Sequence, residues 1–139
     1  MPVTVLAFDF GLRRIGVAVG QDVTGSASPL GTVRNGDAGP DQARIAELIR
    51  EWHPSSLVVG MPYHADGSDS DIQAPVRAFI ASLEPYGLPV ESVDERYTSV
   101  EAQRLLKNAR TSGSRGRLSK ADIDSAAAVM IAERYLSML

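Results

Sequence analysis

The sequence contains no cysteine, and its 139 residues include only two histidines, His53 and His64. Disulfides and thiolate metal sites are therefore excluded. With so few imidazoles, a metal ion would be held mainly by carboxylates, which favours a hard cation such as Mg²⁺ or Mn²⁺. His64 falls in a polar loop sequence, where we expect a surface side chain more than a ligand.

Long hydrophobic runs are also missing. No apolar stretch approaches the roughly 20 residues that cross a bilayer. The N-terminus enters a strand pattern directly, without the basic and apolar segments of a signal peptide. We therefore expect a cytoplasmic protein without a membrane partner. The length, with 44% hydrophobic and 22% charged residues, fits one ordinary domain over residues 1–139.

The charge is small overall but unevenly placed. The net charge is −3, which alone argues against binding to nucleic acid. Residues 96–120, however, hold seven basic residues and one acidic residue, a net +6, so the remainder is −9. A basic block on an acidic body can attract a phosphate backbone, although a solvated helix face and loop would show the same composition. The basic residues are Arg96, Arg104, Lys107, Arg110, Arg115, Arg117 and Lys120.

The first 33 residues predict three antiparallel strands. Residues 3–11 are β-branched and aromatic, with Asp9 near their end, and Gly11 allows an immediate turn into a return strand over 12–19. Residues 26–33 suggest a third, shorter strand.

Helices and strands then alternate. Asp41 can cap a helix that Pro54 ends, and residues 57–60 are short and apolar, as in a central parallel strand. Further patterns predict a helix from Ile72 to Leu83, a strand over 90–96, a helix from Thr98 and a last helix from Ser119. The resulting order, β-β-β-α-β-α-β-α-α, predicts an α/β fold with a mixed sheet covered by helices. This order is similar to the ribonuclease H-like architecture.

Three carboxylates have unusual placements in this scheme. Asp9 and Glu95 each end a strand, and Asp124 lies early in the last helix beside an Ala-rich run that lets the helix approach the sheet closely. If the three converge, their mutual repulsion calls for a divalent cation. Two such ions can activate a water and stabilise both oxygens of a phosphodiester displacement.

Each acid also has a simpler interpretation. Asp9 can pair with Arg13 or Arg14 across the hairpin. Asp94, Glu95 and Arg96 can form a local charge pair at a strand end, in which the arginine neutralises the acids. Asp122 fits the capping position opposite Ser119, so it ranks below Asp124. Whether Asp94 or Asp122 assists the centre stays open at this point.

Four blocks of sequence together resemble the YqgF-type family of Holliday-junction-resolvase-like proteins and pre-16S rRNA nucleases. The blocks are Asp9–Ala18, Val58–Pro62 with Asp66–Ser68, Asp94–Ser99, and Lys120 with Asp124–Ala128, in the family's order. The resemblance implies a ribonuclease H-like, metal-dependent nuclease. It points to Asp9, Glu95 and Asp124 as catalytic and metal-binding residues, with Arg13, Arg14 and Arg96 beside them.

Several functions fit these features. The first is a hydrolase that matures the 5′ end of pre-16S rRNA in ribosome biogenesis. The second is a Holliday junction resolvase acting on branched DNA. Junction resolution calls for a homodimer with two active sites, whereas rRNA maturation is compatible with a monomer or a homodimer. A third is a non-catalytic RNA-binding module, and a fourth is a sugar-kinase-like phosphotransferase, for which one domain is too small.

Overall fold

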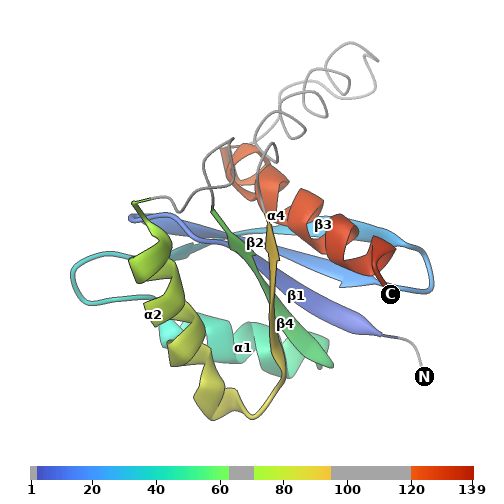
Figure 1. The fold of residues 1–139 in the computed structure, drawn as a ribbon, viewed down its shortest axis with the longest axis horizontal. Helices are drawn as coiled ribbons and strands as arrows, with labels where there is room; N and C mark the ends of the chain where they lie inside the picture. The colour runs from blue at the N-terminus through green and yellow to red at the C-terminus, as the bar shows by residue number, and fades with distance from the viewer. Residues whose placement is uncertain (1–2, 63–70, 95–119) are drawn as a thin grey trace.

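The computed structural model of the chain describes residues 3–62, 71–94 and 120–139, and for residues 120–124 the backbone alone. These residues form a five-stranded mixed sheet in the order β3-β2-β1-β4-β5, flanked by helices (Figure 1). Along the chain the elements are β1 (Thr4–Asp9), β2 (Arg14–Gln21), β3 (Ser26–Arg34), α1 (Gln42–Trp52), β4 (Ser56–Met61), α2 (Gln73–Leu83), the short 3-10 helix η1 (Glu84–Tyr86), β5 (Val90–Asp94) and α4 (Lys120–Ser137).

The sheet has the predicted mixture of antiparallel and parallel strands. β1, β2 and β3 pair as antiparallel neighbours, and β4 and β5 continue the other side of β1 in parallel. β1 is therefore central, as expected for an apolar strand buried on both faces. The predicted α/β mixed sheet is confirmed, although β1 ends at Asp9, two residues earlier than expected.

The prediction of a shorter third strand is wrong. β3 spans nine residues and is the longest strand of the described sheet. Its pairing with β2 shifts register between Val17 and Ala18, opposite Pro29 and Gly31. Pro29 does not end the strand, because β3 lies at the sheet edge, where proline is tolerated at a bulge. Pairing resumes beyond the bulge and continues to Arg34.

Helices cover both faces of the sheet (Figure 1). On one face, Leu6 and Phe8 of β1 pack into a core with Ile45 of α1 and Phe79 of α2. On the other face, Val5 and Ala7 pack with α4 through residues such as Ile131. Alternate residues of β1 thus serve the two cores, which is the period of two that a strand dictates.

The predicted helices that fall within the described residues are present. Asp41 caps α1, since its side chain accepts a hydrogen bond from the backbone N–H of Arg44 at 3.2 Å. α2 ends at Leu83 as expected. The helix predicted from Thr98 and the cap predicted at Ser119 lie outside the described residues. No helix in the part of the chain that the structure describes is long and apolar enough to cross a membrane.

Small residues bring α4 close to the sheet. A Cβ atom added to Gly20 would lie 3.1 Å from Leu136 Cδ1 and 3.3 Å from Ala132 Cβ. Ala18, which lies two residues before Gly20 on β2, packs against Ala128 and Val129. The Ala-rich face predicted from the sequence therefore does allow a close helix–sheet contact.

Candidate functional site

The carboxyl ends of three neighbouring strands meet at one edge of the sheet. Because β1, β4 and β5 are parallel, Asp9, Met61 and Asp94 end their strands on the same side. In open α/β sheets this edge is where ligands bind. The strand order thus directs the search for a functional site to the residues around Asp9.

Asp9 lies on the face of the sheet that α4 covers. It follows Val5 and Ala7 by alternation, and both of these pack against α4. The side chain is half-buried at the edge of the core. The strand thus fixes the backbone of Asp9 and presents its carboxylate at the edge of the core.

The turn after Asp9 is tightly constrained. A Cβ atom at Gly11 would lie 2.4 Å from the carbonyl oxygen of Arg14, so only glycine fits there without moving the backbone. Asn35, just after β3, donates from Nδ2 to the Gly11 carbonyl at 2.7 Å, and its backbone N–H donates to the Arg13 carbonyl at 2.9 Å. The end of β3 therefore holds the turn that carries Arg13 and Arg14.

A hollow of about 280 Å³ opens beside Asp9. Asp9, Gly16 and Thr32 form one row across β1, β2 and β3. Gly16 has no side chain, so the middle of the row is low between Asp9 and Thr32. The hollow, here called the Asp9 hollow, is lined by Asp9, Gly11, Arg13, Arg14, Gly16 and Thr32.

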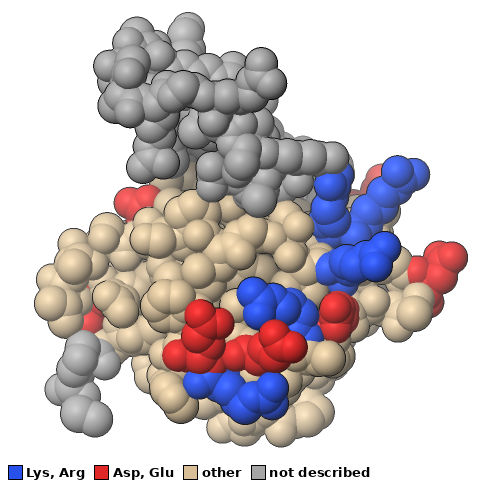
Figure 2. All heavy atoms as spheres, turned by 180° about the vertical axis from the view of Figure 1, so that it is seen from behind, with Lys and Arg blue, Asp and Glu red and all other residues tan. Residues whose placement is uncertain are grey.

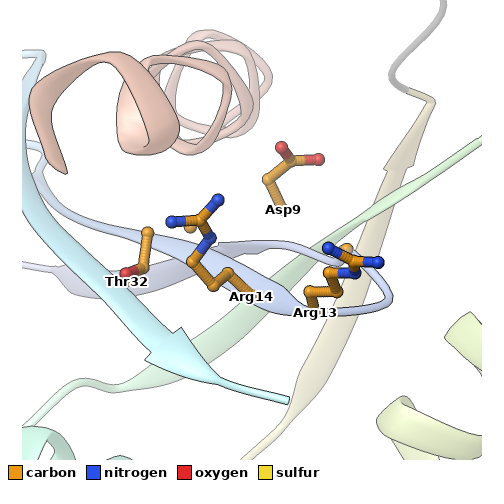
Figure 3. A pocket seen from close by; sticks show the side chains of 6 residues that line it. Asp9, Arg13, Arg14 and Thr32 are labelled. Carbon is orange, nitrogen blue, oxygen red and sulfur yellow. The ribbon is translucent and has the colours of Figure 1, made fainter. Parts of the chain in front are cut away.

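Figure 3 shows how the side chains of this hollow point. Asp9 and Arg14 stand on the same side of the sheet, toward a helix that passes above, and Arg13 extends from the turn nearby. Arg13 and Arg14 are exposed. The hollow therefore combines one carboxylate with two guanidinium groups that solvent and an anionic ligand can reach.

The start of α4 extends toward the same edge. Ala132 lies near Gly20 and Ala128 packs against Ala18, so each step toward the start of the helix moves along β2 toward Gly16. Four helix residues advance about 6 Å and two strand residues about 7 Å. Asp124, four residues before Ala128, is thus on the turn of α4 that approaches the Asp9 edge.

α4 is also tied to the end of β5. Arg134 Nη1 donates to the backbone carbonyl of Asp94. Ser125, next to Asp124, is completely buried. These contacts fix the helix that carries Asp124 relative to the strand ends.

The predicted site residues differ in how far the structure describes them. Asp9, Arg13 and Arg14 lie together at the Asp9 hollow. Lys120 and Asp124 belong to α4, but only their backbone is described. The others lie outside the described residues: Glu95, Arg96, Arg104, Lys107, Arg110, Arg115 and Arg117.

The described donors fit a hard cation. Within residues 3–62, 71–94 and 120–139 no group of three His, Cys, Asp or Glu side chains gathers to hold a metal. Asp9 offers carboxylate oxygens beside an open hollow, which suits Mg²⁺ or Mn²⁺. His53 caps the end of α1, three residues before β4 starts at the opposite edge of the sheet, so it cannot contribute.

Sequence reasoning missed three residues of this site: Gly16, Thr32 and Asn35. Asparagine directly after a strand is a common turn residue, and this signal could have pointed to Asn35. Thr32 belongs to the Asp9 row only through the pairing of β2 with β3. Alternation along β3 could have placed Thr32 on a face, but not opposite Gly16.

The chain is similar to known proteins over most of its length. A model of the RuvX family, described as "Holliday junction resolvase", matches residues 3–138. The chain belongs to this family. The predicted YqgF-type resemblance is thereby confirmed.

Two relatives share nearly half of their residues with the chain. A protein of Chromobacterium violaceum is 47% identical over 127 residues, which cover 91% of this chain and 91% of the relative. A protein of Nitrosococcus oceani is 47% identical over 98% of this chain and 88% of its own. Both carry the name "Putative pre-16S rRNA nuclease".

Solved structures share the fold. RuvC of T. thermophilus in complex with a Holliday junction substrate matches with a TM-score of 0.59 and 16% identity, over 98% of this chain and 96% of that one. A Fowlpox virus resolvase matches with a TM-score of 0.52 and 9% identity, over 98% of both chains. The predicted ribonuclease H-like fold is confirmed by these neighbours.

Proposed function

We propose that the protein is a metal-dependent endonuclease that matures the 5′ end of pre-16S rRNA. The observation that carries the proposal is Asp9, which stands half-buried at the carboxyl end of the central strand, beside a hollow that two exposed arginines line. The names of the relatives support a nuclease, as the sequence predicted. A cytoplasmic location fits a precursor rRNA substrate.

Asp9 anchors the proposed catalytic centre, because the central strand fixes its backbone. We assign Glu95 and Asp124 as the other two carboxylates, following the family resemblance. Together they would hold Mg²⁺ or Mn²⁺, which, when bound, activates a water and stabilises charge on the phosphate. The chain's own contribution is to fix the backbones that carry the carboxylates. Because Gly16 has no side chain, it also leaves room for the phosphate in the Asp9 hollow.

The arginines have a different task. Arg13 and Arg14 reach the Asp9 hollow from the turn that Asn35 holds. A planar guanidinium can donate two hydrogen bonds to phosphate oxygens. We assign both residues to holding the substrate backbone, together with the predicted basic residues of the 96–120 block.

Replacement of Asp9 tests the proposal. Asp9→Asn removes one charge at constant size and should lower kcat on a precursor 16S rRNA fragment at least about a hundredfold, because metal-supplied stabilisation is worth several kcal/mol. Asp37→Asn, the same change on an exposed loop, is the matched control. EDTA should abolish wild-type cleavage, and Mn²⁺ or Mg²⁺ should restore it. Cleavage by Asp9→Asn at the wild-type rate would refute the proposal.

A second candidate is resolution of branched DNA. The description of the family model and the resolvase neighbours favour it. Symmetric cutting of a four-way junction needs two active sites related by a two-fold axis. Sedimentation with a synthetic junction, and assay of junction and rRNA cleavage side by side, separate the candidates. A monomer that trims precursor rRNA and leaves junctions intact would exclude the second. Binding without any metal-dependent cleavage would instead favour the non-catalytic RNA-binding module.

A further inference from the structure

Two arginines face each other across the ends of β2 and β3. Arg14, the first residue of β2, is directly opposite Arg34, the last residue of β3. Directly opposed residues of an antiparallel pair have Cα atoms about 4.5–5.5 Å apart. Like charges in such a position repel and destabilise the sheet. The pairing thus brings two basic side chains together at this end of the sheet.

Both arginines lie on the face that carries Asp9. Their neighbours Ile15 and Val33 form the next pair and are buried in the core under α1 and α2. By alternation, Arg14 and Arg34 belong to the opposite face. Figure 3 shows Arg14 rising on the same side of the sheet as Asp9.

The Arg34 guanidinium is available for a ligand. Arg34 is exposed, and no hydrogen bond or ion pair within the described parts of the chain engages its side chain. Of the two acids on the following loop, Asp41 uses its carboxylate to cap α1, and Asp37 is exposed. Figure 2 shows several Lys and Arg side chains at one edge of the described surface, with Asp and Glu side chains near them.

The distance between Arg34 and Asp9 indicates which part of a substrate Arg34 could hold. Asp9 lies on β1, and Arg34 lies two strands away on β3, which is about 10 Å at the usual strand spacing. The Gly16–Thr32 floor of the Asp9 hollow lies between them. At this spacing a second phosphate of the same strand has room at Arg34, beside the phosphate that Asp9 serves.

We propose that Arg34, paired with Arg14, forms a second phosphate subsite that holds the substrate backbone beside the cleaved position, with Thr32 between the two sites. The proposal rests on the proposed nuclease function and adds a positioning residue outside the sequence-predicted set. Two guanidinium groups at one strand pair can share a phosphate through several charge-assisted hydrogen bonds. The β2–β3 pairing fixes the backbone of both residues, so the subsite is preorganised.

The test compares Arg34→Ala with Arg50→Ala. Arg50 is an exposed arginine in the last turn of α1, which packs on the other face of the sheet, so both variants lose one positive charge. Binding of a fluorescein-labelled precursor 16S rRNA fragment is measured by anisotropy in EDTA over a range of KCl concentrations. Cleavage is measured in Mg²⁺, and thermal unfolding checks the fold.

Arg34→Ala should weaken binding roughly tenfold, as expected for one charge-assisted contact. Its slope of log K against log salt should become shallower by about 0.7–0.9. KM should rise while kcat stays within about twofold, and the Tm should stay near that of the wild type because Arg34 is exposed. Arg50→Ala should leave affinity, slope and KM near those of the wild type.

Each outcome decides a specific claim. Equal affinities and slopes for the two variants, with a wild type that binds, would overturn the subsite and leave the proposed function standing. A wild type that neither binds nor cleaves the RNA would overturn the proposed function, and the subsite with it. Weaker binding by Arg34→Ala together with undiminished cleavage by Asp9→Asn would support the subsite while refuting the proposed catalytic role of Asp9.

Discussion

The side-chain amide of Asn35 donates a 2.7 Å hydrogen bond to the carbonyl oxygen of Gly11. Through this bond, the residue after β3 fixes the turn that separates Asp9 from Arg13 and Arg14. Asn35 also accepts a hydrogen bond from the Gly36 N–H at 3.0 Å, so both ends of its amide are used. The geometry of the candidate site thus depends on a residue 24 positions away in sequence.

Asn35→Asp should impair catalysis more than it impairs folding. The carboxylate keeps the acceptor for Gly36 but has no donor for Gly11, and two oxygens then face each other. We expect the free energy of unfolding to fall by about 1–3 kcal/mol, as for a lost hydrogen bond with an unsatisfied partner. The turn should then deviate, and kcat on the RNA substrate should decrease beyond what the unfolded fraction explains.

Gln42→Glu is the matched control for that variant. Gln42 Nε2 donates to Ser82 Oγ at 3.0 Å and its Oε1 accepts from the Tyr86 hydroxyl at 2.6 Å. Gln42 belongs to α1, which packs on the face of the sheet opposite to Asp9. The same amide-to-carboxylate change should lower stability by a similar amount and leave kcat unchanged. An equal loss of kcat in both variants would show that Asn35 acts only through stability. Urea unfolding and initial-rate assays are sufficient for the comparison.

Gly11→Ala should distort the turn itself. The added Cβ would meet the carbonyl oxygen of Arg14 at 2.4 Å, and a backbone atom cannot move aside as a flexible side chain can. We expect a loss of about 1–3 kcal/mol in the free energy of unfolding and a strong decrease in cleavage. Gly36→Ala is the control, because a Cβ there has no heavy atom within 4 Å. If Gly11→Ala were as stable and active as Gly36→Ala, the close approach would be irrelevant to the site.

Much of the fold was accessible from the sequence because local patterns and topology agree. The apolar run ending in Asp9 predicts a central strand, and the glycine after it predicts the hairpin. The helix patterns around Ile45 and Phe79 follow the 3.6-residue period, so the core under α1 and α2 was predictable as well. These features depend on residues close together in the chain.

The β2–β3 register could not be predicted in the same way. Gly20 pairs with Ala27, and that register, continued without a shift, would place Val33 opposite Arg14. The bulge near Gly31, whose φ is 92°, moves the pairing by one residue and brings Arg34 opposite Arg14. One residue of register turns every side chain to the other face. The arginine pair therefore follows from a bulge that no local pattern of hydrophobicity reveals.

The candidate site was predictable in its acidic anchor and less so in its surroundings. Asp9 stands out in sequence because a charge ends an apolar strand. Asn35 and Thr32 are ordinary polar residues whose importance appears only when β3 lies beside β2. Glu95 and the side chain of Asp124 lie outside what the structure describes, so their roles stay predictions.

Glu133 gives the chain a pH-dependent stability that can be measured apart from catalysis. It is half-buried on α4, and burial raises the pKa of its carboxyl above the ordinary value of 4.5. Because the folded-state pKa is higher than the unfolded one, folding favours the protonated form. This contribution to stability is fully present below the unfolded pKa and is lost as the pH rises through the folded pKa.

Glu133→Gln removes the charge at nearly constant size and should therefore be more stable than the wild type at pH 7. The difference in Tm should shrink as the pH falls toward 4, where the wild-type carboxyl is protonated as well. Glu51→Gln, the same change at an exposed position on α1, is the control. Thermal unfolding of the three proteins between pH 4 and 8 makes the comparison. A gap between Glu133→Gln and wild type that widens toward acid would contradict the role of burial, because desolvation penalises only the charged form.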